Sequence, residues 1–477
     1  MASEITISQN PSVVVIGAGV AGIAAASRLH ENGITDVKIL EAGERIGGRI
    51  YSVLFGNGYV DLGADRCYGE TSNIVYELVK DCDLLKRPPE VFPDLYHSTR
   101  KLIEPKFKDE LYQIYTEVYN EDRQGVHGSR SLGEHVTKRF FETIIQTWDS
   151  NNEKFLVASE SIDLFHKWVL SHEGATSWFN VATKSDFEKI KGNQHLHWNG
   201  VGFKTIFDVL MKKSPDLEHN ILLYKEVNEI EWNVSDKTIV SCLDGSTYQA
   251  DHVILTVSLG VLKDKYSTLF TPQLETSKIY AIKELGMGTV TKMFLRFRNS
   301  WWNEDFAGYS FLWDEQDLEK PGMFFDGPIK NGKSWITSIL AILPVPNNPE
   351  VLEVWFTGEF VMEIEKCTSD TIINGIMFVL SVFEVCDFGD LIRPYQILRH
   401  NWNTNTHFRG THSYQAARVK SEQRTLIDHL CQPLVNRAGK LSVLFAGEAT
   451  HPTHFSTVHG AIESGFREAD RLISMYQ

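Results

Sequence analysis

Short apolar runs and small-residue stretches alternate at the start of the chain. The β-branched run Ser12–Ile16 predicts a buried parallel strand, and the run Val37–Leu40 predicts a second strand. Between them lies Ile23–Leu29, whose mostly small and apolar residues favour a helix. Strand, helix and strand in this order are typical of an α/β protein with a parallel sheet.

The turn that joins the first strand to the helix is rich in glycine. It reads GxGxxG, in which Gly17 permits a tight turn, Gly19 lets a pyrophosphate approach the backbone and Gly22 lets the helix pack on the strand. The first N–H groups of the helix favour phosphate binding. Glu41 follows Gly22 by 19 residues and is placed to accept a ribose 2′-hydroxyl. The pattern therefore predicts a dinucleotide site that disfavours NADP and leaves NAD and FAD open.

A second glycine motif separates these two cofactors. The segment Arg45–Arg49 reads RIGGR and is followed by Asp61–Ala64, which reads DLGA. Arginines beside paired glycines suit bidentate contacts to phosphate, although solvated surface arginines are an alternative. The two segments resemble the ExxxxxGGR extension of the flavin amine oxidase superfamily. The resemblance implies that the cofactor is FAD rather than NAD. The residues implied to contact FAD are Arg45, Gly48, Arg49, Gly63 and Ala64.

Motifs farther along the chain extend this resemblance from residue 13 to residue 472. The segments Leu444–His451 and Ser456–Ala461 are similar to those of the animal polyamine oxidases, and a helical pattern follows Thr457. In that family the helix start faces the flavin, where negative charge collects on reduction. The implied FAD contacts outside the first eighty residues are Val227, Trp402, Gly447, Glu448, Thr457 and Val458.

The segment Leu285–Leu295 resembles the part of the family that carries an active-site lysine. Alternation places Met293 and Leu295 on one face of a predicted strand and Lys292 on the other. A lysine in a strand is usually solvated. The resemblance instead implies that Lys292 holds a water against flavin N5 and assists reoxidation by molecular oxygen.

Several pocket positions depart from the family pattern. Tyr68 stands where animal polyamine oxidases have a histidine, while His412 and Phe455 replace tyrosines. Monoamine oxidases attach their flavin to a cysteine at the position of Thr411, so non-covalent FAD is expected here. Because rejection of an analogue depends on such polar partners, the exact amine stays open. Tyr68 and His412 are expected to join Lys292 in the active site.

A histidine triplet, His451, His454 and His459, falls inside the C-terminal motif. It has no HExxH pattern and no cysteine partner, so no metal is expected.

Composition argues against several other classes of function. The formal charge is −15 from 47 basic and 62 acidic residues, which argues against nucleic-acid and anionic-membrane binding. None of the six cysteines lies closer than 15 residues to another, which fits reduced thiols. The N-terminus shows no secretory pattern and the longest uncharged stretches are too short for a membrane span, so a cytoplasmic protein is expected.

These patterns predict an α/β fold with a discontinuous Rossmann-type FAD-binding domain and an inserted α+β substrate domain. The FAD-binding domain is expected to comprise residues 1–85, 196–265 and 426–477, and the substrate domain residues 86–195 and 266–425. These boundaries follow the resemblance, and the oligomeric state stays open.

The implied function is FAD-dependent oxidation of polyamines, namely spermine, spermidine or acetylated forms, to an aldehyde, a shorter amine and hydrogen peroxide. The partners would be a small amine and molecular oxygen. Two alternatives stay open. One is an oxidase of an aromatic amine or an amino acid, whose carboxylate would need Arg66 or Arg409. The other is a non-catalytic FAD-binding scaffold.

Overall fold

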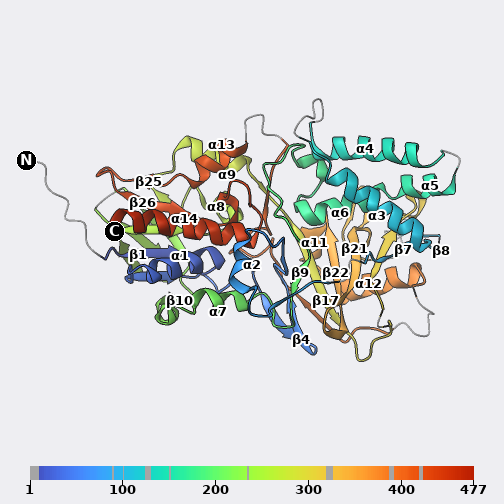
Figure 1. Ribbon diagram of the computed structural model, residues 1–477, viewed down its shortest axis with the longest axis horizontal. Coiled ribbons are helices and arrows are strands. Elements are labelled where there is room, and N and C mark those ends of the chain that lie inside the picture. The colour runs from blue at the N-terminus through green and yellow to red at the C-terminus, as the bar shows by residue number, and fades with distance from the viewer. Residues whose placement is uncertain are drawn as a thin grey trace, which may run out of the picture.

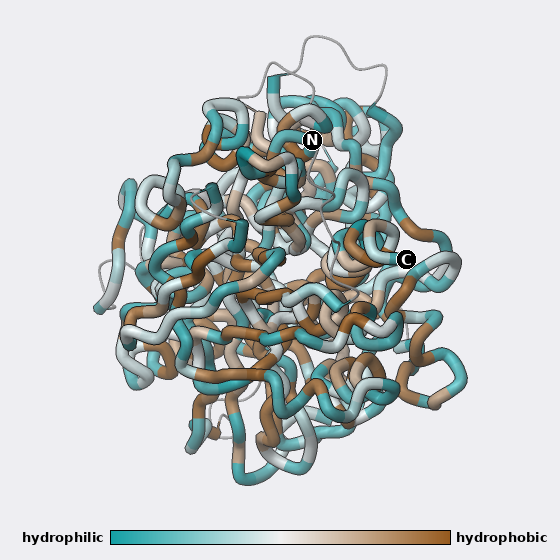
Figure 2. The backbone as a smooth tube through the Cα atoms, turned by 90° about the vertical axis from the view of Figure 1, so that its left-hand side faces the viewer, coloured by the Kyte–Doolittle hydropathy of each residue, from teal (hydrophilic) through white to brown (hydrophobic). Residues whose placement is uncertain are grey.

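The computed structural model describes ten stretches of the chain, residues 10–88, 91–99, 101–123, 130–149, 152–233, 236–303, 305–318, 326–385, 392–417 and 423–477. They form two lobes along the long axis of the molecule, and the first described strand, Val13–Ile16, lies in the same lobe as the C-terminal end of the chain (Figure 1). Viewed from that lobe, apolar segments gather toward the interior and polar segments follow the outer loops (Figure 2). Among the described helices, none is both long and apolar enough to cross a bilayer.

A parallel sheet forms the centre of the first lobe. Its strands in the described chain run in the order β10-β2-β1-β14-β26-β25. Their bounds are β10 (Ile221–Leu222), β2 (Val37–Leu40), β1 (Val13–Ile16), β14 (His252–Leu255), β26 (Leu441–Phe445) and β25 (Leu434–Val435). All neighbours pair in parallel except β25, which is antiparallel to β26. Strands from the beginning, middle and end of the sequence therefore complete one sheet.

Two long helices cover one face of this sheet. The helices α1 (Val20–Glu31) and α14 (Val458–Tyr476) pack side by side in the left-hand lobe (Figure 1). Their approach is close, because a Cβ at Gly465 would lie 2.3 Å from the Ala21 carbonyl oxygen. Shorter helices flank them, α2 (Ile74–Val79) and α7 (Thr205–Met211).

Buried apolar residues connect the other face of the sheet to a small second layer. That layer contains helices α8 (Leu259–Lys265), α9 (Thr276–Glu284) and α13 (Gln423–Cys431). It also contains a sheet whose described strands are β13 (Thr247–Ala250), β12 (Thr238–Cys242), β11 (Val227–Glu231) and β15 (Phe270–Thr271).

The second lobe is built on a mostly antiparallel sheet. Its described strands run in the order β23 (Gln396–Arg399), β17 (Val290–Arg296), β22 (Asn348–Thr357), β21 (Ile339–Val345), β18 (Tyr309–Leu312), β7 (Asp94–His97) and β8 (Lys101–Leu102). Apolar clusters connect it to helices α3 (Pro105–Tyr119), α4 (Leu132–Thr147), α5 (Glu153–Glu160) and α6 (Ile162–Glu173), and to α11 (Val361–Ile364) and α12 (Ser369–Val382).

Short strands lie near the junction of the lobes. They are the pair β3 (Ser52–Phe55) and β4 (Gly58–Asp61), the sheet of β5 (Arg66–Cys67), β9 (Leu196–Trp198) and β6 (Leu85–Lys86), and the pair β16 (Gly286–Met287) and β24 (Ser413–Tyr414). A parallel sheet assembled from distant segments, beside an α+β lobe, confirms the predicted fold class. The domain boundaries given above stay predictions.

Candidate active site

A cavity of about 1640 Å³ lies between the lobes. Its walls come from the glycine turn after β1 on one side and from β17 and β22 on the other. Most of the predicted site residues line it, namely Gly17, Gly19, Glu41, Gly48, Arg49, Gly63, Ala64, Tyr68, Val227, Lys292, Trp402, His412, Gly447, Glu448, Thr457 and Val458. Gly22 and Arg45 are outside this lining.

The glycine turn leaves backbone open to the cavity. Gly17 has a positive φ of +103°, and a Cβ there would lie 2.6 Å from Thr256 Oγ1. A Cβ at Gly22 would lie 2.1 Å from the Gly17 carbonyl oxygen, so this glycine permits α1 to pack against the turn. By contrast, no described atom lies within 4 Å of a Cβ built on Gly19, which precedes α1 and has no capping side chain. An open backbone at a helix start fits a phosphate group.

Glu41 braces this turn from the end of β2. Its Oε2 accepts a hydrogen bond from the Ala18 N–H at 2.8 Å, and its Oε1 accepts one from the Gly43 N–H at 2.8 Å. The carboxylate still lines the cavity. The sequence pattern suggested a ribose contact but gave no sign of this bracing role.

The two arginines of the RIGGR segment have different surroundings. The Arg45 guanidinium donates to the carbonyl oxygens of Ile46, Gly48 and Ile50 at 3.0, 2.8 and 3.3 Å, and lies 3.8 Å from the Tyr51 ring centroid. Arg45 therefore stabilises the glycine loop from the side that does not line the cavity. If Arg45 were to contact a pyrophosphate directly, its guanidinium would have to give up its hydrogen bonds to these carbonyl oxygens.

Arg49 instead joins a buried network with Glu448. Its Nη1 donates to Glu448 Oε1 at 2.8 Å and to the Thr411 carbonyl oxygen at 2.6 Å. The second oxygen of Glu448 accepts from Ser413 Oγ at 2.6 Å and from the Ser456 N–H at 2.9 Å. Burial opposes ionisation of Glu448, but the Arg49 charge and the hydrogen bonds from Ser413 and Arg49 together outweigh it, so the pKa of Glu448 is lowered. This network ties distant segments of the chain together at the cavity wall.

Thr457 is the N-cap of α14. Its Oγ1 accepts a hydrogen bond from the Gly460 N–H at 3.0 Å, while Thr457 and Val458 both line the cavity. The start of this 19-residue helix therefore faces the cavity. Its unpaired N–H groups and dipole favour negative charge there.

Removal of this cap gives a first test. Thr457→Val is expected to lower the free energy of unfolding by about 1 kcal/mol, because one helical N–H loses its acceptor. Urea unfolding measures the effect. Thr457→Ser, which keeps the oxygen, is the control and should stay close to the original protein. Equal stability of the valine variant would contradict the capping role.

Lys292 lies in the middle of β17 with 5% of its side chain exposed. Its Nζ is 2.9 Å from Asp65 Oδ2 and 3.3 Å from Glu353 Oε1. Burial favours the neutral amine, but Asp65 and Glu353 outweigh it, so the pKa of Lys292 is raised and the group is a cation at neutral pH. The alternative of a solvated lysine is wrong. Met293 and Leu295 point to a separate apolar core, as the alternation predicts.

Sequence reasoning missed the acidic partners of Lys292. Asp65 directly follows the Gly63-Ala64 motif, so a charged residue at that position was a usable signal. Glu353 lies on β22, and nothing local to it indicated the contact. Nearby Asp61 accepts hydrogen bonds from Ser52 Oγ and from the Phe203 N–H, and burial raises its pKa to about 6.

Tyr68 and His412 share the cavity with Lys292. Tyr68 is 39% exposed, toward the cavity it lines, and burial within the protein together with Asp65 raises the pKa of its phenol. Burial lowers the pKa of His412. Both groups are therefore uncharged at neutral pH and offer hydrogen bonds without charge.

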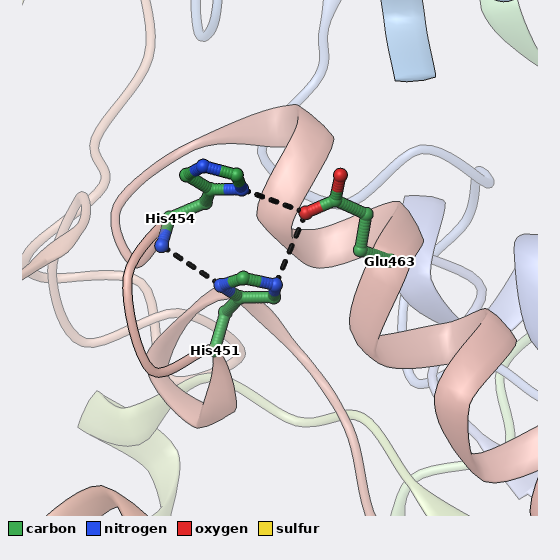
Figure 3. A group of neighbouring side chains, drawn as sticks. All are labelled: His451, His454 and Glu463. Carbon is green, nitrogen blue, oxygen red and sulfur yellow. Dashed lines mark hydrogen bonds and ion pairs between the residues drawn. The ribbon is translucent and has the colours of Figure 1, made fainter. Parts of the chain in front are cut away.

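Two of the three C-terminal histidines, His451 and His454, form a cluster with Glu463 (Figure 3). His451 Nε2 and His454 Nδ1 both face Glu463 Oε2, at 3.0 and 2.8 Å. The other nitrogen of His451, Nδ1, accepts the His454 backbone N–H at 2.8 Å, so the proton of the neutral ring must be on Nε2. A metal ligand needs a free lone pair at that nitrogen. The three side chains are therefore arranged to hydrogen-bond with one another. The expectation that no metal binds here stays a prediction.

The fold and the cavity together define an α/β protein with a large cavity at the carboxyl ends of parallel strands. The family model described as flavin containing amine oxidoreductase matches residues 20–473. The chain belongs to this family, and it is a flavin-dependent amine oxidase.

Relatives match over nearly the whole chain. The chain is 28% identical to probable polyamine oxidase 5 of Arabidopsis thaliana, over 99% of each chain. It is 28% identical to human peroxisomal N(1)-acetyl-spermine/spermidine oxidase, over 98% of this chain and 95% of that protein. It is 29% identical to protein anon-37Cs of Drosophila melanogaster, over 98% and 92%.

Proposed function

We propose that this protein is a polyamine oxidase that uses non-covalently bound FAD. The observation that carries the proposal is the placement of Lys292, a buried cation, in the same cavity as the open glycine turn. The names of the relatives support the substrate class. Lys292, Tyr68 and His412 are the proposed active-site residues.

The residues present fit FAD. The Gly17–Gly22 turn and the start of α1 would hold the pyrophosphate, Glu41 a ribose and Val227 the adenine. Thr411 lines the cavity and has no thiol, which supports non-covalent binding. When bound, FAD supplies hydride abstraction from the carbon beside the amine nitrogen and return of the electrons to oxygen as hydrogen peroxide.

In the proposed reaction, the residues of this chain control the charge of the bound amine. An aliphatic amine with a pKa of about 10 is mostly protonated at neutral pH, whereas the reacting nitrogen must be neutral. Asp65 and Glu353 balance the cation of Lys292, so removal of the amine from water, rather than repulsion by the lysine, would favour the neutral form of a bound amine. Glu173 and Asp305 also line the cavity and offer carboxyl groups to more distant nitrogens of a polyamine.

Product analysis tests the proposed function. Purified protein is precipitated with acid, and the released flavin is identified by chromatography as FAD. Intact protein is then supplied with spermine, spermidine and N1-acetylspermine under air. We expect an aldehyde, a shorter amine and hydrogen peroxide in equal amounts. Flavin that stays with the precipitate would contradict non-covalent binding, and protein that neither contains nor takes up FAD would contradict the proposal.

The described cysteines are free thiols, which supports a reducing compartment, and we propose the cytoplasm. Two matched relatives are named peroxisomal, so cell fractionation is the test.

One rival has a specific observation in its favour. An oxidase of an amine that carries a carboxylate needs a cation for that group. Arg66 lines the cavity, whereas Arg409 does not. Arg409 Nη2 lies 3.3 Å from Asp264 Oδ2. Arg66 is therefore the residue on which this question depends.

A further inference from the structure

The register of the sheet places Glu353 beside Lys292 on the cavity face of the second lobe. In the antiparallel pair of β17 and β22, Lys292 lies opposite Trp355, and Phe294 lies opposite Glu353. Glu353 is therefore a diagonal neighbour of Lys292, within reach of a long side chain. Both residues line the cavity, and Lys292 Nζ lies 3.3 Å from Glu353 Oε1.

The two carboxylates that contact Lys292 come from different elements. Asp65 lies in the loop before β5, whereas Glu353 lies in the middle of β22. A lysine side chain is a flexible chain of four carbons that ends in a point charge. One carboxylate could pair with this charge, but two from different directions, at 2.9 and 3.3 Å from Nζ, also fix its place. The Trp355 ring, whose centroid is 5.1 Å from Nζ, limits the motion of the ammonium further.

Stability alone gives little reason for a carboxylate at position 353. Only 12% of the Glu353 side chain is exposed, and within the described chain its ion-pair partner is Lys292. Asp65 has a second cation nearby, since its Oδ2 lies 3.9 Å from Arg66 Nε. A buried ion pair often stabilises a fold no more than well-packed apolar residues do. The pair of Lys292 and Glu353 therefore points to a requirement for charge in the cavity.

The charges around Lys292 favour its protonated form. The titratable groups that influence this cluster are one further cation, three carboxylates and a phenol, namely Arg66, Asp61, Asp65, Glu353 and Tyr68. The phenol is uncharged at neutral pH because its pKa is raised. Asp61 acts at longer range, and burial raises its pKa to about 6. With all three carboxylates ionised, acidic groups outnumber the two cations by one, and removal of Glu353 would leave equal numbers.

We infer that Glu353 is a positioning residue of the active site, which fixes the Lys292 ammonium at the cavity wall and keeps it charged during turnover. Glu353 acts through Lys292 rather than on the amine itself. The inference rests on the proposed function and deepens it, because it assigns to β22 a carboxylate whose charge the reaction needs in addition to that of Asp65.

Replacement of Glu353 by glutamine tests the inference in the flavin-loaded protein. Glutamine keeps the size of the side chain and removes its charge. We expect kcat to fall about tenfold while KM stays within about twofold, because the reaction step loses more than amine binding does. The basic limb of the pH–rate profile should move to lower pH, since loss of a neighbouring carboxylate lowers the pKa of the Lys292 ammonium.

Chemical labelling of Lys292 gives a readout that does not depend on turnover. Acetic anhydride reacts with the neutral form of an amine, and mass spectrometry of the peptide that contains Lys292 measures the rate. At a fixed pH, Glu353→Gln should be labelled at Lys292 at least about threefold faster than the original protein, because the neutral fraction of an amine rises tenfold for each unit by which its pKa falls.

Glu350 provides a matched control on the same strand. Its Oε2 lies 3.2 Å from Nη2 of Arg296, a residue of β17, and Glu350 is outside the cavity lining. Glu350→Gln therefore also removes one carboxylate from an ion pair between these two strands. It should leave kcat, the pH–rate profile and the labelling of Lys292 close to those of the original protein.

Equal kcat values and equal labelling rates in the two glutamine variants would overturn the inference. Slower turnover of Glu353→Gln with an unchanged pH–rate profile and unchanged labelling would also overturn it, because these results indicate a purely structural role. If Glu353→Gln does not fold, the aspartate variants decide, since aspartate keeps the charge and is one methylene group shorter. A lower kcat in Glu353→Asp than in Glu350→Asp supports the inference, and equal values overturn it.

The two readouts separate this inference from the proposed function. Amine oxidation that is insensitive to Glu353→Gln would overturn the inference and leave the proposed function standing. A protein that oxidises no amine would overturn the proposed function and the role of Glu353 in turnover, even where labelling shows the effect of Glu353 on the Lys292 charge.

Discussion

Replacement of Lys292 by methionine is expected to lower turnover about 10²–10³-fold, in a protein that still folds and binds flavin. The change removes a buried cation whose Nζ lies 2.9 Å from Asp65 and which lines the proposed active site. Methionine has a similar length and fills the same space, so loss of charge dominates over loss of packing. Stopped-flow absorbance measures flavin reduction by amine and flavin reoxidation by oxygen as separate rates.

Lys278 provides a matched control for this substitution. It is also buried, and its Nζ donates to the carbonyl oxygens of His429, Leu430 and Gln432, outside the cavity lining. Lys278→Met should lower stability but leave turnover per bound flavin close to that of the original protein. The catalytic role of Lys292 would be refuted if both variants kept the original rates.

Replacement of Glu448 by leucine should lower the free energy of unfolding by about 3 kcal/mol or more. The substitution leaves Arg49 without its partner and removes the acceptor for Ser413 Oγ and the Ser456 N–H. Loss of one member of a buried ion pair is costly because the other charge is left uncompensated. Urea unfolding of the flavin-free protein measures the effect, with Glu448→Gln as the milder control. A leucine variant within about 1 kcal/mol of the original would contradict this account.

The pH dependence of this contribution has a definite sign. The pKa of Glu448 is lower in the folded protein than in the unfolded chain, so the unfolded state binds its proton first as pH falls. The stability difference between the original protein and the leucine variant should be complete at neutral pH. It should begin to shrink near the unfolded-chain pKa of about 4.3 and continue to fall below it.

Local sequence patterns were sufficient to predict the start of the parallel sheet in the first lobe. The run of β1, the glycine turn and α1 is contiguous in sequence, and Gly17 and Gly22 each have a steric reason that follows from their position in the turn. The same holds for Thr457, because an N-cap threonine before a helical pattern is a short-range signal. Alternation along β17 placed Lys292 on the correct face.

Long-range pairings explain what the sequence did not reveal. Lys292 meets Asp65 and Glu353 only because β17, β22 and the loop before β5 converge on one cavity. Such charge pairs leave no periodic trace in the sequence. Arg45 shows the opposite case, since its motif suggested a phosphate contact but its nearest acceptors are carbonyl oxygens of its own loop.

We expect this cavity to oxidise amines with a bound flavin. Anaerobic titration of the flavin-loaded protein with spermine, spermidine, N1-acetylspermine, an aromatic amine and an amino acid tests it most directly. We expect a polyamine to remove the visible absorbance of the oxidised flavin, at a rate that saturates with amine concentration. Loss of absorbance with another amine alone would keep the chemistry and change the substrate. A flavin that stays oxidised with every amine would overturn the proposed oxidase function and favour a non-catalytic flavoprotein.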